Sequence, residues 1–428
     1  FKEESARLAE GTAEIRDTAG IGTVEERLDA LRKLHNLQQS YEPYRTRKRF
    51  AKRPHPESPA FPSEHDYMIL LERFPLWAQK GWRQPYRDDP ALGYFGQGGH
   101  AENSLRTLGN FVFTCAVLAT EEAYDPNVSG VPRETVRDWA LAAIRYAART
   151  HVSGDLPCAS GKSWGNHWQS AWWTSKLIAG ATLLRENLTE AEWQGIRRVV
   201  IHEADRHLDR TPPGAEFKNT RSEENAWDSE VLAWAAGLFP DHPRADAWEQ
   251  KAREFFMNTL SVRADARDDT VIDGKPVKEW VKTVNVHDDF TIENHGSYQF
   301  CYMACPLHSL TWAYYAYRVT GRAPPAALFH HFRDVWRRAR GTFLYDGRFA
   351  YLGGKDWARY VYGLYFIMPP LVMMQHEFDD RDARLIERLR FRTFEWEQRQ
   401  HGDGGLFSGR FTNNVMAGWP SEYETDGA

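Results

Sequence analysis

The sequence lacks the features that mark three large classes of protein. No apolar run reaches the roughly 18–20 residues that a helix needs to cross a bilayer, so we expect no membrane span. The formal net charge of −5 leaves no basic footprint for nucleic acid. Only four cysteines occur in 428 residues, and none forms a CxxC pair. This excludes a scaffold held together by several disulfides, although the four cysteines still allow a single disulfide.

Metal-binding motifs are also scarce. The sequence has no HExxH motif, and only His287, Asp288 and Asp289 form a grouping that could hold an ion. We therefore predict a protein that uses no metal or other cofactor. The chain begins with Phe1 rather than Met, which is compatible with a removed leader segment. We predict a secreted or periplasmic protein, with a cytoplasmic one as the alternative.

Aromatic residues, by contrast, are abundant: they make up 14% of the chain and include 17 Trp. One interpretation is a large core, since hydrophobic residues amount to 42% of the sequence. The other is a surface that stacks on sugar rings, because one face of a sugar ring is apolar and fits a flat aromatic side chain.

Helical patterns dominate from residue 101 onward, and we predict an all-α protein. The predicted helices span 101–122, 133–150, 165–186, 189–208, 222–239, 244–260, 295–320, 325–341, 357–377 and 380–399. Strand signals are few. At most one short β-hairpin is predicted, within 270–286, turning at Asp273 and Gly274.

Several of these helices are apolar or aromatic on nearly all sides, for example 168–184 and 310–319. A helix that is apolar all round is buried all round. We therefore predict an inner ring of helices covered by an outer ring, as an (α/α) toroid or an incomplete barrel of helical hairpins. Residues 1–62 are predicted to be a helical lead-in and linker, and 63–428 the catalytic domain. Polar residues at the starts of the inner helices would then line a cleft.

The polar stretch 289–302 supplies the first candidate for chemistry at such a helix start. A helix over this stretch, with the pair Asn294 and His295 at its start, would place His295, Tyr298 and Tyr302 on one face. An amide, an imidazole and a phenol suit the removal of a weakly acidic proton, such as the C5 proton of a uronic acid. The amide and imidazole would neutralise the sugar carboxylate, and a tyrosine would serve as base and acid.

A second stretch, 346–365, adds a guanidinium and more phenols. Arg359 is a further group for neutralising a carboxylate, while Tyr360 and Tyr362 are candidates for the base. Lys355, in the same stretch, is predicted to bind substrate. The predicted catalytic residues are Asn294, His295, Tyr298, Arg359, Tyr360 and Tyr362.

The order of these motifs resembles that of α/α-toroid polysaccharide lyases, in particular alginate lyases, and also the heparinase II/III-like lyases. Alginate lyases carry an Asn-His pair at the start of an aromatic helix, then a DG turn, an Arg, closely spaced tyrosines and a Pro-Pro-Leu helix. Here the chain reads ENHGSYQFCYMACPLHSL and then YDGRFAYLGGKDWARYVYGLYFIMPPLVMM. The likeness is confined to roughly residues 285–375, and the Arg-to-Tyr interval differs from that of alginate lyases. It implies an anionic-polysaccharide lyase without fixing alginate as the substrate.

Other helix starts carry residues that we predict to bind substrate. Asn166 and His167 form a rival Asn-His pair, and Trp164, Trp168 and Trp172 repeat at helical spacing. The indole stripe could equally be core, and the acidic residues at 223–224 could simply stabilise a helix N-terminus. The predicted substrate-binding residues are His100, Asn166, His167, Trp168, Trp172, Glu223, Glu224, Asn225 and Lys355.

Two alternatives to a lyase stay open. An inverting glycoside hydrolase on the same toroid needs two carboxylates flanking a water, and Glu224 with Asp289 would supply them. A non-catalytic glycan-binding scaffold would keep the aromatic residues without needing the Asn-His-Arg-Tyr set. The predicted partner is an anionic polysaccharide or oligosaccharide, and neither a nucleic acid nor a membrane.

Overall fold

The computed structural model describes residues 61–298, 300–344, 347, 366–406, 425 and 428. The chain divides into two compact units, Phe1–His55 and Pro56–Ala428, and every described residue belongs to the second. This second unit is mostly helical, with only short strand pairs, which confirms the predicted all-α class.

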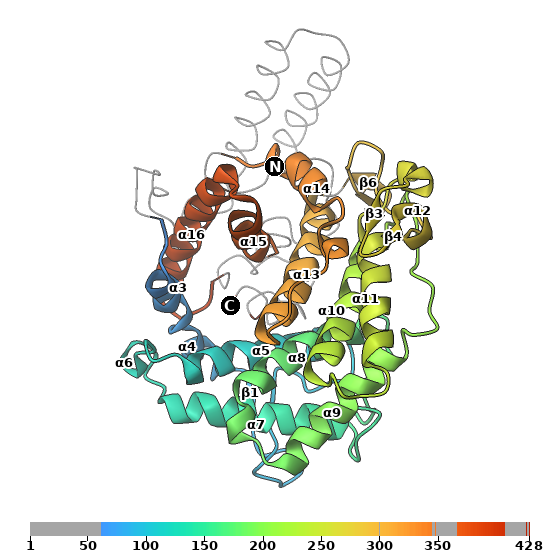
Figure 1. The fold of residues 1–428 in the computed structure, drawn as a ribbon. Helices are drawn as coiled ribbons and strands as arrows, with labels where there is room; N and C mark the ends of the chain where they lie inside the picture. Colours follow the sequence, from blue (N-terminus) through green and yellow to red (C-terminus); the bar gives the residue numbers. More distant parts are fainter. Residues whose placement is uncertain (1–60, 299, 345–346, 348–365, 407–424, 426–427) are drawn as a thin grey trace, which may run out of the picture. The chain divides into compact units, whose positions relative to one another are not determined.

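Two series of helices, alternating along the chain, build this unit (Figure 1). In the first series each helix packs against the next: α5 (Glu102–Thr120), α8 (Ser170–Leu183), α10 (Ser222–Leu238), α13 (Phe300–Val319) and α15 (Met368–Phe378). The second series packs against the first: α7 (Arg133–Thr150), α9 (Glu190–Asp205), α11 (Ala245–Thr259), α14 (Phe332–Arg340) and α16 (Arg381–His401). Consecutive helices thus pair as α5–α7, α8–α9, α10–α11, α13–α14 and α15–α16.

The two series differ in how completely they are buried. Every residue of α8 from Ser170 to Ala181 is buried, as its all-round apolar pattern predicted. Every residue of α10 from Ser222 to Ala236 is buried as well, although this stretch carries four acidic residues. The helices of the second series keep a polar face. Capping residues in the sequence mark where some of them begin. Thr189 caps α9 through a reciprocal pair of hydrogen bonds with Glu192, which fixes the predicted helix start.

Shorter elements connect these helices. They are α3 (Glu64–Leu71), α4 (Phe74–Ala78), α6 (Pro126–Ser129), α12 (Val277–Trp280) and the 3₁₀ turns η1 (Arg185–Asn187), η2 (Arg263–Arg267) and η3 (Ala326–Phe329). The predicted hairpin is confirmed as β3 (Val271–Ile272) with β4 (Lys275–Pro276), with Asp273 and Gly274 in left-handed conformations. Two further antiparallel pairs, β1 (Trp82–Arg83) with β2 (Tyr94–Phe95) and β5 (Glu293–Asn294) with β6 (Ser297–Tyr298), exceed the single hairpin predicted.

The β5–β6 pair also overturns the prediction of a helix from residue 295. His295 and Gly296 have φ angles of 53° and 73°, which close a tight turn and which a right-handed helix cannot contain. Helix α13 therefore begins only at Phe300.

The predicted helical stripe of three indoles is wrong for a similar reason. Helix α8 begins at Ser170, because Gly165 and Asn166 have positive φ angles of 114° and 57°. Trp164 and Trp168 therefore lie in the loop before the helix, and only Trp172 lies on it.

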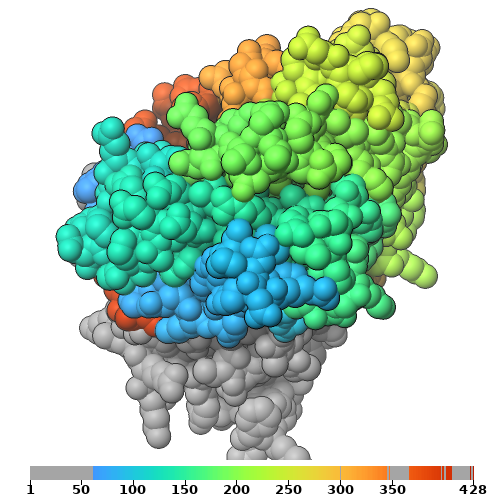
Figure 2. All heavy atoms as spheres, turned by 90° about the horizontal axis from the view of Figure 1, so that it is seen from below, coloured from blue at the N-terminus to red at the C-terminus, as the bar shows by residue number. Residues whose placement is uncertain are grey.

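Stacked aromatic rings join the N-terminal part of the unit to the helices. Phe111 of α5 stacks on Phe95, with ring centroids 4.7 Å apart, and on Trp82 at 5.4 Å. Figure 2 shows the segment that contains these strands, in blue, lying over the face formed by α5 and α7. All four cysteines are buried in the interior as thiols. Among the described helices, none is both long and apolar enough to span a bilayer.

A buried ion pair joins α8 to α10 and yields a stability prediction. Lys176 Nζ donates to Glu230 Oε2 at 2.5 Å, with both side chains almost inaccessible to water. Removing one partner strands the other charge, so Lys176→Met is expected to lower the free energy of unfolding by about 3–5 kcal/mol in urea titrations. The double variant Lys176→Met/Glu230→Leu should recover most of this loss. Arg185→Met, which removes a solvent-exposed pair with Glu190, should change stability little.

Candidate functional site

The starts of α5, α8, α10 and α13, which are successive helices of the first series, meet at one end of that series. We call this region the rim. At the α5–α8 junction, Gln169 Nε2 donates to Glu102 Oε1 at 2.9 Å. At the α8–α10 junction, the indole of Trp172 stacks on that of Trp227 with centroids 4.5 Å apart. At the α10–α13 junction, the backbone N–H of Thr220 donates to the carbonyl of Glu293 in β5. The rim thus brings together polar clusters that are far apart in sequence, as predicted.

The β5–β6 hairpin carries the predicted Asn-His pair at the α10–α13 junction of the rim. His295 is exposed, and its Nε2 lies 3.2 Å from the phenol oxygen of Tyr302 on α13. Asn294 is buried, and its Oδ1 accepts a hydrogen bond from the His295 backbone N–H. Tyr298 points elsewhere, since its hydroxyl donates to Met303 Sδ at 3.2 Å. Imidazole and phenol therefore meet as expected, but through a hairpin turn and with Tyr302 in place of Tyr298.

The first turn of α10, beside this hairpin, carries a buried neutral acid. Burial raises the pKa of Glu223 to about 8, and the adjacent carboxylate of Glu224 adds to the shift. Its Oε2 has no hydrogen-bond partner among the described residues. An acid held protonated at neutral pH can donate a hydrogen bond to an anion.

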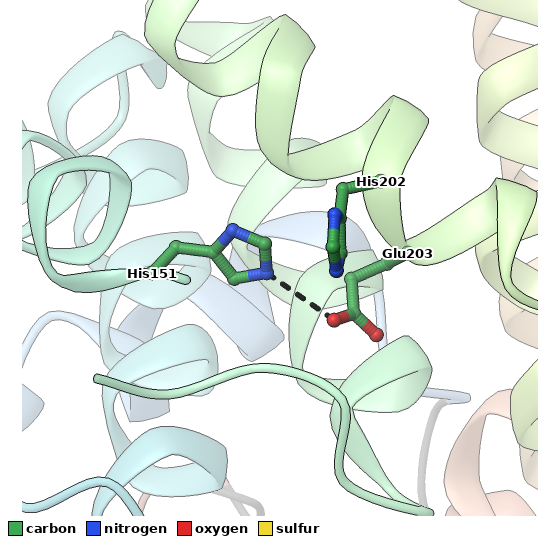
Figure 3. A group of neighbouring side chains, drawn as sticks. All are labelled: His151, His202 and Glu203. Carbon is green, nitrogen blue, oxygen red and sulfur yellow. Dashed lines mark hydrogen bonds and ion pairs between the residues drawn. The ribbon is translucent and has the colours of Figure 1, made fainter. Parts of the chain in front are cut away.

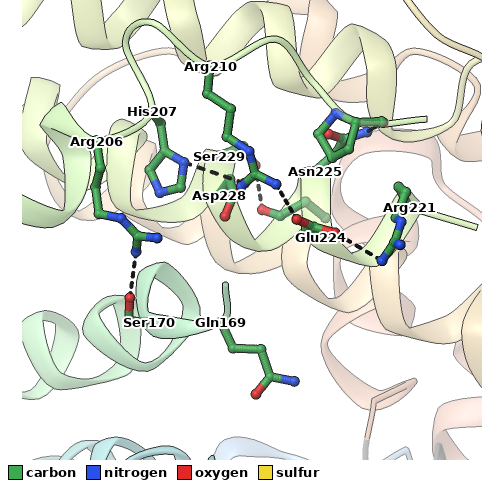
Figure 4. Close-up of polar contacts among 12 residues, drawn as sticks. Gln169, Ser170, Arg206, His207, Arg210, Arg221, Glu224, Asn225, Asp228 and Ser229 are labelled. Carbon is green, nitrogen blue, oxygen red and sulfur yellow. Dashed lines mark hydrogen bonds and ion pairs between the residues drawn. The ribbon is translucent and has the colours of Figure 1, made fainter. Parts of the chain in front are cut away.

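Glu224, the next residue of α10, lies between two arginines (Figure 4). Its carboxylate is bound by Arg210 and by Arg221, so it is committed to a charge network. Arg210 also binds Asp228 at 2.6 Å, one turn further along α10. In this network Glu224 is a poor choice for the general acid of a hydrolase, because its side chain would have to leave two guanidinium groups to reach a substrate.

Glu203 of α9 fixes the loop before α8. Its Oε1 accepts hydrogen bonds from His151 Nε2 (3.2 Å, Figure 3) and from the Asn166 backbone N–H (3.0 Å). Its Oε2 accepts from Ser170 Oγ (2.5 Å) and Arg206 Nη1 (2.7 Å). Burial alone would raise the pKa of Glu203, but the hydrogen bond from His151 and the charge of Arg206 lower it to about 2.

The same cluster has the residue types of a metal site. His151, His202 and Glu203 offer ligand atoms within 4.8 Å of one another. However, His151 Nδ1 accepts a hydrogen bond from the Ser153 N–H, so in the neutral ring the proton lies on Nε2 and is donated to Glu203. A metal ion would need the Nε2 lone pair of His151, which carries this proton. It would also displace the Glu203 carboxylate, which already accepts four hydrogen bonds. The arrangement favours a structural role.

The loop that Glu203 holds presents an imidazole and an indole at the rim. His167 stacks on Trp173 with centroids 4.9 Å apart, and burial together with the nearby charge of Arg206 lowers its pKa. Trp168 leaves 42% of its surface exposed and packs one edge against Trp227. A neutral imidazole beside an open indole is suited to a sugar, which offers hydroxyls and an apolar face.

The other predicted site residues differ in their exposure to solvent and in their hydrogen-bond partners. His100 is half-buried and its Nδ1 lies 2.9 Å from Ser160 Oγ. Trp172 and Asn225 are buried in the core, where Asn225 Nδ2 donates to two backbone carbonyls. Asp289 is exposed and accepts hydrogen bonds from Thr291. The following predicted residues lie outside the described part of the chain: Lys355, Arg359, Tyr360 and Tyr362.

Sequence reasoning missed the polar residues at the end of α9 and just beyond it. Glu203 lies in the last turn of α9 and Arg206 and Arg210 follow the helix, and together they reach both the α8 loop and α10. The charged residues of this stretch were the available signal, and it was obscured because charged residues usually face solvent.

A comparison with known protein families and with curated protein sequences finds no match for this chain. The geometry of the rim therefore carries the functional argument.

The low pKa of Glu203 predicts an acid-sensitive contribution to stability. A folded-state pKa of about 2 against an ordinary 4.5 stabilises the fold by roughly 3 kcal/mol above pH 4.5, since each tenfold change in an acid constant is worth about 1.4 kcal/mol. Glu203→Gln should lose about this amount at pH 7, and the difference from the wild type should shrink as the pH falls from 4.5 to 2. Urea titrations across this range measure it. A constant difference would contradict the assignment.

The raised pKa of Glu223 predicts the opposite behaviour. Because the folded-state pKa of about 8 lies above the ordinary 4.5, ionisation of the unfolded chain destabilises the fold increasingly between these two pH values. Glu223→Gln should therefore be more stable than the wild type by roughly 3 kcal/mol at pH 7 and much less so at pH 5. Thermal or urea denaturation at both pH values tests this. Equal stability at pH 7 would show that Glu223 is ionised.

Proposed function

We propose that the protein is a polysaccharide lyase that cleaves a uronate-containing glycan by β-elimination on an incomplete (α/α) toroid. The observation that carries this proposal is the meeting of His295 and Tyr302 at the rim, with their imidazole and phenol 3.2 Å apart. The alternating helix pairs support the toroid, because their first series is buried and begins at the rim.

The imidazole–phenol pair would act as the proton-transfer group. His295 Nε2 takes up the proton of Tyr302, so that the phenol oxygen can accept the C5 proton of the uronate. The C5–H electron pair then forms the C4–C5 double bond, and the C4–O bond breaks with its electron pair going to the leaving oxygen. Tyr302 donates the proton it has accepted to that oxygen and takes back a proton from the His295 imidazolium, so the pair returns to its starting state.

The same reaction requires that the charge of the sugar carboxylate be offset. Glu223, kept protonated by burial, adds no negative charge to the first turn of α10, so it does not repel that carboxylate. Arg221 lies two residues before Glu223 in the sequence, and its half-exposed guanidinium supplies positive charge at the edge of the rim. Retaining a buried carboxyl with a raised pKa costs stability, which is typical of functional sites.

Trp168 supports sugar binding at the α8–α10 junction of the rim. Its exposed indole lies against Trp227 of α10, the helix whose first turn carries Glu223. An apolar sugar face stacked on this ring would place the neighbouring residue of the glycan over the rim.

Activity should depend on the proposed proton-transfer pair. A panel of uronate polysaccharides and oligosaccharides is incubated with the protein, and the ultraviolet absorbance of the conjugated, unsaturated uronate product is followed. We expect His295→Ala and Tyr302→Phe each to lower kcat/KM by about 10²-fold or more, the usual contribution of a general base.

A matched control is available in the same hairpin. Tyr298→Phe removes the same hydroxyl group, but that hydroxyl contacts Met303 rather than His295, so activity should change little. New reducing ends without ultraviolet absorbance would indicate a hydrolase instead, and binding without turnover would indicate a glycan-binding scaffold. Either result would reject the lyase.

A further inference from the structure

A second histidine cluster lies away from the rim, where the end of α11 meets the start of α14. Asp265 of η2 faces two consecutive histidines: its Oδ2 lies 3.2 Å from His330 Nε2 and its Oδ1 lies 2.9 Å from His331 Nε2. Asp265 and His330 are almost inaccessible to water, while the side chain of His331 is 20% exposed. No step of the proposed reaction uses these residues.

We infer that Asp265, His330 and His331 form a binding site for a divalent transition-metal ion of the zinc type. All three ligand atoms lie within 4.8 Å of one another. With bonds of about 2.0–2.1 Å, neighbouring ligands of a tetrahedral zinc ion are about 3.3 Å apart. The two nitrogen–oxygen distances, which end on different oxygens of Asp265, are already close to that separation.

The surroundings of His331 match those of a metal ligand. Its Nδ1 lies 3.0 Å from Asp334 Oδ2, and Asp334 is in turn bound by Arg337 at 2.6 Å. Without an ion, Nε2 donates its own proton to Asp265, as His151 Nε2 does to Glu203. Because Asp334 holds a second proton on Nδ1, an ion can replace the Nε2 proton and leave a neutral ring, the usual outer-sphere arrangement of ligating histidines. His151 differs, since its Nδ1 already accepts a backbone hydrogen bond and holds no proton.

The backbone supplies an independent observation. His331 adopts a left-handed conformation with φ of 54°, which is unfavourable for a residue with a side chain. Consecutive side chains normally diverge, yet this conformation brings the rings of His330 and His331 to 4.0 Å between centroids, and both face Asp265. The strained residue therefore creates the ligand set.

Three protein ligands leave a fourth position, which the partial exposure of His331 leaves open to water or to a small anion. The ion would fasten η2 to the start of α14. The ring of Phe290 lies 5.0 Å from that of His331, and Arg338 Nε donates to the Asp289 carbonyl. The site therefore also supports the segment that leads into β5, although its existence does not depend on the lyase proposal.

Metal binding can be tested on the full chain without a histidine tag. The protein is stripped with a chelator and titrated with Co²⁺, whose visible absorption bands report tetrahedral coordination, and then with Zn²⁺ in competition. We expect one Co²⁺ per chain, displaced by one Zn²⁺. His331→Asn, which tolerates the left-handed backbone, should abolish the bands, and Asp334→Asn should weaken affinity by about 10–100-fold.

Two comparisons make the outcome decisive. His202→Asn removes a histidine from the other cluster and should leave the Co²⁺ spectrum and stoichiometry unchanged. Circular dichroism of His331→Asn checks that the variant is folded, and Asp265→Asn provides a second ligand deletion. The site is rejected if the wild type shows no tetrahedral bands, if folded His331→Asn and Asp265→Asn bind Co²⁺ like the wild type, or if His202→Asn loses the ion instead.

Discussion

A carboxylate removed from water has to find its hydrogen-bond partners inside the protein, and this constraint shapes the whole rim. Glu203 meets it with four donors from three separate segments, and those bonds determine where the loop before α8 lies. Glu230 meets it with Lys176, which ties α8 to α10. Because an unpartnered buried charge costs several kcal/mol, the helices have little freedom to slide past one another.

Glu223 differs from these two, and that contrast gives the rim its functional interest. One oxygen each of Glu223, Asp228 and Glu230 has no hydrogen-bond partner among the described residues, but Asp228 and Glu230 also form ion pairs with Arg210 and Lys176. Burial raises the pKa of Glu223 to about 8, which keeps its carboxyl protonated at neutral pH. Its neighbour Glu224 forms ion pairs with two arginines. Adjacent residues with the same side chain therefore lie in different surroundings, one with a pKa raised by burial and one between two guanidinium groups. The two histidine clusters differ for a similarly local reason, the partner of Nδ1.

Much of the fold followed from the sequence. The helix predicted at 133–150 matches α7 at both ends, and those predicted around α9, α10 and α11 agree within a few residues. Their patterns extend over many turns, and caps such as Thr189 mark their ends. The prediction failed at residues 165–169 and 295–298, where a few positive φ angles interrupt an otherwise helical pattern. Such angles are set by tertiary contacts, for example the Glu203 bond to the Asn166 backbone.

For the site, the sequence by itself determined which residue types were present and that Glu223 stands at the start of a helix, while His167 and the pair Asn294 and His295 proved to lie in the loop and the hairpin before their helices. Only the tertiary structure decided that Tyr302 rather than Tyr298 meets His295, that Trp172 is core while Trp168 is exposed, and that Glu223 is neutral. The physical reason is that direction, burial and protonation depend on neighbours contributed by distant segments. Spacing along one helix carries no information about those neighbours.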